Sequence, residues 1–304
     1  MLAITVQTER GERLARVAAD RLEELVHRIG DDGDRFLVME RIPELPDVFA
    51  QVWHEQGGDY QVEYRDGAAD RHFGAQIADV RLVAAALTGW ARGEQEWGAG
   101  FEWQRVDLGP APKPAPELAE PVRTALESRV RELIACGYDG RDRLTEAAED
   151  CLVDGKRRPV STAQARALVD RLWLERVEEQ RHWRGTTDPE RIRAAFAALE
   201  RRGITARENF TCCRSCGDAE IGAEAAEGAR GFVYFHSQST ESAAAGHGLM
   251  LLFGGFDGRE ESTVEVGREV VAALAEAGLR ADWDGSASRA VHVTPLDWRK
   301  RLGD

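Results

Sequence analysis

Three of the five cysteines of this chain stand within five residues, in the run Cys212-Cys213-Arg-Ser-Cys216-Gly217. Thiols this close together can share a metal ion, form a redox pair or fill space in a core. The spacing Cys213-x-x-Cys216 is typical of a metal knuckle or of a redox motif. No second Cys-x-x-Cys pair accompanies it in the sequence. Metal binding, thiol chemistry and structural packing therefore stay open.

A zinc ion is the cofactor that the metal interpretation implies, because zinc takes four thiolate, imidazole or carboxylate ligands in a tetrahedron. Adjacent cysteine side chains diverge, so Cys212 and Cys213 can act together only if the backbone turns sharply. His236, at the end of an expected strand, is the best fourth ligand, and Asp218 is another candidate. The predicted metal ligands are thus Cys212, Cys213, Cys216 and His236.

The redox interpretation depends on a helix expected over residues 217–226. It would place Cys216 near a helix N-terminus, where the helix dipole stabilises a thiolate, and Arg214 would add to that effect. A thioredoxin-like motif, however, follows a strand and has two cysteines, whereas here a third thiol intrudes. The run Asn209-Phe210-Thr211 is only weakly strand-like.

Polar side chains gather where the expected strand Gly231–His236 ends. Strand alternation puts Tyr234, His236 and Gln238 on one face, and polar groups at a strand end before a helix often line a cleft. The residues predicted to line a cleft are Tyr234, Gln238, Thr240 and Glu241. The structural alternative is a His236 hydrogen-bonded in the core, with Ser239 or Thr240 capping a helix.

The clearest boundary is the run Gly109-Pro-Ala-Pro-Lys-Pro-Ala-Pro116, with four prolines in eight residues. Such a run cannot continue a helix or a central strand and is typical of a stiff, extended spacer. We therefore expect a small α+β domain over residues 1–108, a linker over 109–116, and a second domain over 117–304.

Apolar periodicity in the first domain predicts helices over 9–29 and 79–92. Between them, short extended runs separated by Gly57-Gly58 and Asp66-Gly67 predict an antiparallel meander. The predicted strands are Phe36–Ile42, Val48–Trp53, Tyr60–Tyr64 and His72–Ile77.

The second domain is expected to begin with four helices and to continue as an α/β or α+β sheet of four to five strands with helices. The helices are predicted over 118–137, 142–152, from a capping box at Ser161 to 182, and from an N-cap at Asp188 to Gly203. The predicted strands are Ile204–Ala206, Gly231–His236, Leu249–Phe253, Leu279–Trp283 and Ala290–Thr294, with further helices over 217–226 and 262–277.

The formal net charge of −14 argues against nucleic-acid binding, because a phosphate backbone would be repelled. Residues 1–108 alone carry 21 acidic and 12 basic side chains, a net charge of −9. The first residues lack a basic, apolar leader, and no run of eighteen apolar residues occurs, so neither export nor a membrane span is expected. Five cysteines is an odd number, and three of them are crowded together. Reduced thiols in the cytoplasm fit this better than a set of disulfides does.

The region from about residue 118 to 302 resembles an actinobacterial domain of unknown function. The resemblance rests on the run from Asp188 through Gly203-Ile-Thr-Ala-Arg-Glu-Asn-Phe-Thr-Cys-Cys-Arg-Ser-Cys-Gly217, on Ala219-Glu-Ile221, on Gly231-Phe-Val-Tyr-Phe-His-Ser-Gln-Ser-Thr-Glu241, on Ala281-Asp-Trp-Asp-Gly285 and on Asp297-Trp-Arg299. Two positions depart from it: Ser239 stands where that pattern has an acidic residue, and Pro189 where it has a cysteine. Tyr60-Gln-Val-Glu-Tyr-Arg-Asp-Gly67 and Trp90 resemble a small domain of other actinobacterial proteins.

These observations favour a binding or regulatory protein, possessing a thiol-rich site and an acidic first domain able to mask a basic protein partner, as an immunity-type protein does. The alternative is a metal- or thiol-dependent enzyme with a cleft formed by the cysteines, His236 and Gln238.

Overall fold

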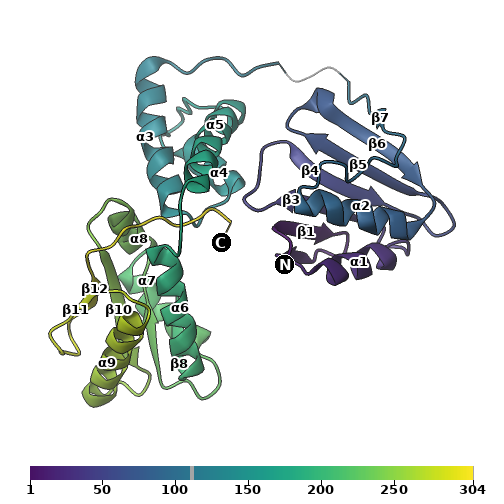
Figure 1. Ribbon diagram of the computed structural model, residues 1–304. Coiled ribbons are helices and arrows are strands. Elements are labelled where there is room, and N and C mark those ends of the chain that lie inside the picture. Colours follow the sequence, from purple (N-terminus) through teal and green to yellow (C-terminus); the bar gives the residue numbers. More distant parts are fainter. Residues whose placement is uncertain (110–112, 304) are drawn as a thin grey trace. The chain divides into compact units, whose positions relative to one another are not determined.

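The computed structural model describes residues 1–109 and 113–303 (Figure 1). It contains two compact units, one built on Met1–Ala115 and the other on Pro116–Leu302. Of the proline-rich run, residues 110–112 lie outside the described residues, while 113–116 have no regular secondary structure. None of the described helices is long and apolar enough to cross a membrane.

The first unit is an antiparallel sheet with two helices. Its strands, in the order β2-β1-β3-β4-β5-β6-β7, are β1 (Ile4–Thr8), β2 (Arg13–Ala15), β3 (Phe36–Arg41), β4 (Val48–Trp53), β5 (Tyr60–Asp66), β6 (His72–Ile77) and β7 (Gln104–Arg105). The helices are α1 (Ala19–Arg28) and α2 (Val80–Arg92), and a 3₁₀ turn, η1 (Ala69–Arg71), precedes β6. The predicted meander is confirmed and extended by three strands.

The helix predicted over 9–29 is wrong in its first half. Residues 4–15 form the hairpin β1–β2, whose turn includes Gly11 at φ +81°, and the helix begins only at Ala19. Ile4 and Val6 are fully buried, which fits the two-residue period of a strand. Pairing of β2 with β1, in which Leu14 lies opposite Val6, thus overrides the helical spacing that Leu14 and Val17 present in the sequence.

The second unit begins with four helices, α3 (Glu120–Cys136), α4 (Arg141–Asp150), α5 (Thr162–Arg181) and α6 (Asp188–Arg201). The capping box of Ser161 and Gln164 is present as predicted. The N-cap of α6 is Thr187 rather than Asp188, because Thr187 and Glu190 form a second capping box and Asp188 is already helical. Gly203 follows α6 with φ +77°, the left-handed conformation expected there.

A five-stranded mixed sheet completes the second unit. Its order is β11-β12-β10-β9-β8, from β8 (Ile204–Arg207), β9 (Gly231–Tyr234), β10 (Leu249–Gly255), β11 (Ala281–Asp282) and β12 (Val291–Val293). β8 and β9 are parallel, and the other pairs are antiparallel. Its helical segments are α7 (Arg214–Glu220), the 3₁₀ turn η2 (Ile221–Glu224), α8 (Ser237–Ala244) and α9 (Glu260–Glu276).

The core of the second unit lies between this sheet and the helices α6 and α9, which pack on each other and on β8 and β10. Two differences from the sequence prediction matter for the site. β9 stops at Tyr234, because His236 already caps α8, and the helix predicted over 217–226 begins three residues earlier, at Arg214. The mixed α and β architecture with two sheets is confirmed.

Candidate functional site

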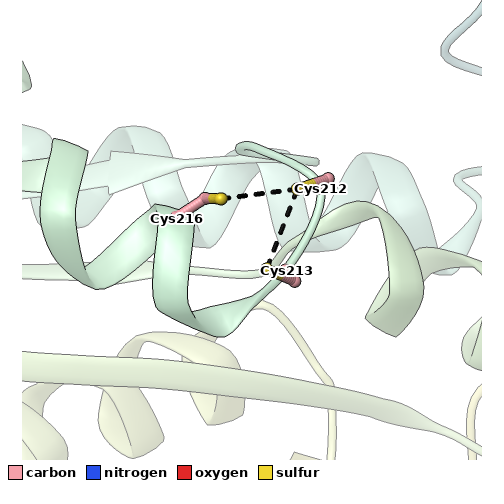
Figure 2. A group of neighbouring side chains, drawn as sticks. All are labelled: Cys212, Cys213 and Cys216. Atoms are coloured by element: carbon pink, nitrogen blue, oxygen red, sulfur yellow. Dashed lines mark hydrogen bonds between the residues drawn. The ribbon is translucent and has the colours of Figure 1, made fainter.

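The loop between β8 and α7 brings three sulfur atoms together. Cys212 precedes the N-cap residue Cys213, and Cys216 lies in the first turn of α7. The Sγ atom of Cys212 lies 3.7 Å from that of Cys213 and 3.5 Å from that of Cys216 (Figure 2). All three sulfurs lie within 4.8 Å of one another, and we call this group the cysteine triad.

The triad exists because the backbone before it makes the sharp turn that adjacent cysteines need. Asn209 and Thr211 adopt positive φ angles, 48° and 58°. A β-branched residue in this conformation is strained, and such strain persists only where the surrounding structure enforces it. Here the Thr211 carbonyl accepts the N–H of Ser237 at 3.1 Å, and the Thr211 hydroxyl donates to the Cys213 carbonyl at 3.2 Å.

The loop is tied to α8 at two further points. The hydroxyl of Ser237 donates to the Cys212 carbonyl at 3.1 Å, and the hydroxyl of Thr240 donates to the side-chain oxygen of Asn209 at 2.8 Å. The start of α8 therefore holds the strained loop in place, and with it the orientation of the triad.

A close approach between Gly217 and Tyr234 seats α7. A Cβ atom on Gly217 would lie 2.4 Å from the Tyr234 ring, so only glycine fits there. Tyr234 is fully buried, packs with Ile221 and Leu252, and donates its hydroxyl to the Asp218 carboxylate at 2.6 Å. The glycine directly after the last cysteine is thus required by packing against β9.

The thiols of the triad differ in acidity. The pKa of Cys213 is lowered, because it accepts hydrogen bonds from the backbone N–H of Cys216 and from the thiols of Cys212 and Cys216. The pKa of Cys216 is raised to about 11, because its thiol is hydrogen-bonded to Cys212 and Cys213 and lies beside their charge. The arrangement favours a thiolate on Cys213 over one on Cys216.

The structure places His236 outside the triad. Within the described part of the chain, the group whose ligand atoms all lie within 4.8 Å comprises the three cysteines. The His236 ring caps α8 instead: Nδ1 accepts the Ser239 N–H at 3.2 Å, and burial lowers its pKa. His236 is thus buried and hydrogen-bonded, as the structural alternative expects, but the cap of α8 is His236 itself rather than Ser239 or Thr240.

The four residues predicted to line a cleft have different surroundings. Tyr234 is buried under α7, Thr240 is buried against Asn209, and Gln238 is exposed. The Glu241 carboxylate faces α3, where it accepts hydrogen bonds from Nη1 and Nη2 of Arg129, at 3.1 and 3.3 Å. Tyr234 ends β9 and the other three lie in the first turns of α8, so the four residues do not form one continuous wall.

A cleft of about 780 Å³ does adjoin the triad, between the loop, α8 and the helices α3 and α4. Cys212 and Glu241 line it, as do two further cysteines, Cys136 and Cys151. Cys136 is buried, its thiol donates to the Glu132 carbonyl at 3.3 Å, and burial raises its pKa to about 12. Cys136 therefore stays protonated, while Cys212 and Cys151 are the exposed thiols of the cleft.

Sequence reasoning missed several residues of this site. Arg129 and Tyr138 come from α3 and from the loop after it, and no local signal connects them to a loop some eighty residues later. Thr211 was missed because threonine gives no indication of a positive φ. Asn209 alone had a usable signal, since asparagine tolerates the left-handed conformation.

Residues 119–302 match the family model described as Domain of unknown function (DUF6891). This chain belongs to the DUF6891 family. The matched region contains the cysteine triad, α8 and the cleft, so these are features of the DUF6891 domain of this protein. No curated protein and no solved structure matches the chain.

Proposed function

We propose that this protein is a cytoplasmic binding or regulatory protein of actinobacterial type, in which the DUF6891 domain holds a zinc ion on Cys212, Cys213 and Cys216. The spacing of the sulfurs carries the proposal. Thiolates bound to one zinc at about 2.3 Å in a tetrahedron lie about 3.8 Å apart. Two sulfur pairs of the triad already lie 3.5 and 3.7 Å apart.

Exposure argues against packing as the reason for the triad. A cysteine that only fills space is among the most buried of residues, whereas Cys212 is exposed and the other two are half-buried. The lowered pKa of Cys213 supplies the first thiolate ligand. The metal would in turn favour the thiolate forms of the other two cysteines, since ligation requires deprotonation.

Three protein ligands leave a fourth position. His236 uses Nδ1 to cap α8, and Asp218 accepts the hydroxyl of Tyr234. We therefore assign the fourth position to water or to a bound molecule. Because Cys212 also lines the cleft, a molecule in the cleft would approach the metal side of the loop.

The first unit supplies the protein-binding part of the proposal. Its net charge of −9 over residues 1–108 suits an immunity-type module that masks a basic protein partner. We propose that residues 1–108 and 117–304 act as separate domains on a proline-rich linker over 109–116, and that the first domain is shared with other actinobacterial proteins.

A second candidate function is a metal- or thiol-dependent enzyme. One observation favours it: the strained residue Thr211 lies directly before Cys212, on the wall of a cleft of about 780 Å³. Strain of this kind gathers at active sites and ligand clamps. The lowered pKa belongs to Cys213, the residue after the cleft-lining Cys212, and its thiolate would act as a nucleophile if no metal were bound to the triad.

Metal analysis of freshly purified protein and of a Cys216→Ser variant tests these alternatives. We expect one zinc per chain, lost in the variant together with several kcal/mol of unfolding free energy, because ligation free energy is folding free energy. Cys151→Ser is the matched control, since Cys151 is an exposed cysteine outside the triad, and it should keep the metal.

The alternatives give different results in the same assay. A thiol enzyme would carry no metal, keep its stability in Cys216→Ser and show a fast-reacting Cys213. Protein that holds no zinc when purified, and takes up none on reconstitution with zinc alone, would refute the metal site.

A further inference from the structure

The first unit has one face of its sheet covered and one face open. α1 and α2 share an apolar core with the side chains of one face, such as Leu37, Met39 and Val52, which are fully buried. Their neighbours in sequence point to the other face, because strand residues alternate. Phe36 and Trp53 on this open face are 37% and 39% exposed.

The register of the strands aligns the open-face residues in rows across the sheet. One row runs over β3 to β6 and pairs successive neighbours: Phe36, Trp53, Gln61 and Gln76. The next row runs over β3 to β7: Val38, Gln51, Glu63, Gly74 and Gln104. The aromatic pair of Phe36 and Trp53 thus lies beside four glutamines, and the carboxylate of Glu63 stands among them.

Two hollows lie along these rows. One of about 390 Å³ lies over the aromatic pair, and one of about 460 Å³ lies over Gly74, which has no side chain to fill it. Gln61 and Glu63 line both hollows, so the two meet at β5. Glu102 and Arg105 line the far side of the second hollow. The open face is therefore a groove with an aromatic end and an amide end.

The carboxylate of Glu63 already accepts three hydrogen bonds from side chains of this chain. It accepts from Gln51 at 2.7 Å, from Gln61 at 2.6 Å and from Nε2 of His72 at 3.1 Å. Arg65 donates to Nδ1 of His72, which fixes the proton on Nε2. Because one N–H of each amide is held inward, the carbonyl oxygens of Gln51 and Gln61 remain as acceptors for a ligand.

These groups suit a ligand that carries donors, positive charge and a flat surface. The guanidinium of arginine has five N–H donors and no acceptor, and it stacks on aromatic rings. Trp53 offers an exposed indole, the glutamines offer acceptors, and the exposed Glu102 offers a negative charge. Arg105 has the opposite sign, but the two carboxylates of the groove and the net charge of −9 over residues 1–108 outweigh it.

We propose that the open face over β3 to β7 binds an arginine-bearing segment of a protein partner. The aromatic pair stacks on one guanidinium, whose N–H groups the glutamine carbonyls accept, while Glu102, three strands farther along the groove, pairs with a second basic side chain of the same segment. This inference rests on the partner binding proposed above and not on the metal site. Beyond general attraction of a basic partner by charge, it names the binding surface, the open face over β3 to β7, and the side chain that is bound, arginine.

The test uses the full-length protein and three nine-residue probe peptides, of arginine, lysine and glutamine, in titration calorimetry. We expect the arginine peptide to bind best, the lysine peptide more weakly and the glutamine peptide not at all. Trp53→Ala should weaken arginine-peptide binding about two- to five-fold, as the loss of one exposed cation–π contact does. Glu102→Gln should weaken it mainly at low salt, where charge is little screened.

Matched controls come from the helical side of the same unit. Leu82→Ala removes an apolar side chain of α2 that is 55% exposed, and Glu23→Gln removes an exposed acid of α1. Neither should change binding. An equal loss with Glu23→Gln would show that net charge alone attracts the peptide, and equal binding of the glutamine peptide would overturn the guanidinium assignment.

Two further outcomes distinguish this inference from the proposed function. If sedimentation shows a dimer that Trp53→Ala dissociates, a second copy of the chain covers the face and the inference is wrong. If no basic peptide binds while each variant retains its zinc, the open-face inference and the basic partner fail, but the metal site stands.

Discussion

Replacement of Gly217 by alanine tests the seating of α7, on which the cysteine triad depends. Helix propensity alone predicts a gain, since alanine is about 1 kcal/mol better than glycine inside a helix. The structure predicts the opposite. The added Cβ would lie 2.4 to 2.7 Å from the ring and hydroxyl of Tyr234, far inside van der Waals contact.

Neither partner can move away easily. Tyr234 is fully buried, and its hydroxyl is held by Asp218, so the ring has no free volume to enter. Overpacking of a core by one methyl group costs about 1–3 kcal/mol. A Cβ only 2.4 Å from a ring that cannot move belongs to the upper part of that range, about 2–3 kcal/mol, so with the propensity gain of about 1 kcal/mol subtracted we expect a net loss of about 1–2 kcal/mol. For a domain of this size the melting temperature should then fall by roughly 2–8 °C.

Urea unfolding followed by circular dichroism measures the change, with Gly222→Ala as the matched control. Gly222 lies in η2, a Cβ there would meet nothing within 4 Å, and its φ is not in the left-handed range. The control should leave stability within about 0.5 kcal/mol of the parent. A Gly217→Ala protein as stable as the control would refute the packing argument, and with it the link from Tyr234 to the triad.

Two other predictions concern the triad and the linker. In metal-free protein, iodoacetamide should alkylate Cys213 at a lower pH than a free thiol, because a lowered pKa makes the thiolate at lower pH, while Cys216 should resist until about pH 11. Peptide mass mapping measures both rates, and equal labelling of the two at pH 8 would contradict the assignment. Limited proteolysis should cut within residues 109–116 and release two folded pieces, because an extended proline-rich run is accessible. Resistance there, with one cooperative unfolding transition, would instead indicate that the two halves are coupled.

Local pattern accounts for much of the fold. The four helices before β8 and the meander of the first unit follow from apolar periodicity and turn residues, and they were predicted within a few residues. The hairpin β1–β2 was missed, because Leu14 and Val17 fit a helical stripe as well as they fit a strand edge. Pairing of β2 with β1, together with the pairing of β1 with β3 farther along the chain, selects the hairpin.

The sequence by itself determined that three thiols would lie near one another, since five residues of chain cannot separate them far. Tertiary structure decided what surrounds them. The positive φ of Thr211, the capping role of His236 and the pairing of Arg129 with Glu241 each depend on α8 packing beside α3 and the β8–α7 loop. Side-chain periodicity reports which face of an element is buried but not which distant element buries it, so the cleft beside Cys212 could be seen only in the folded chain.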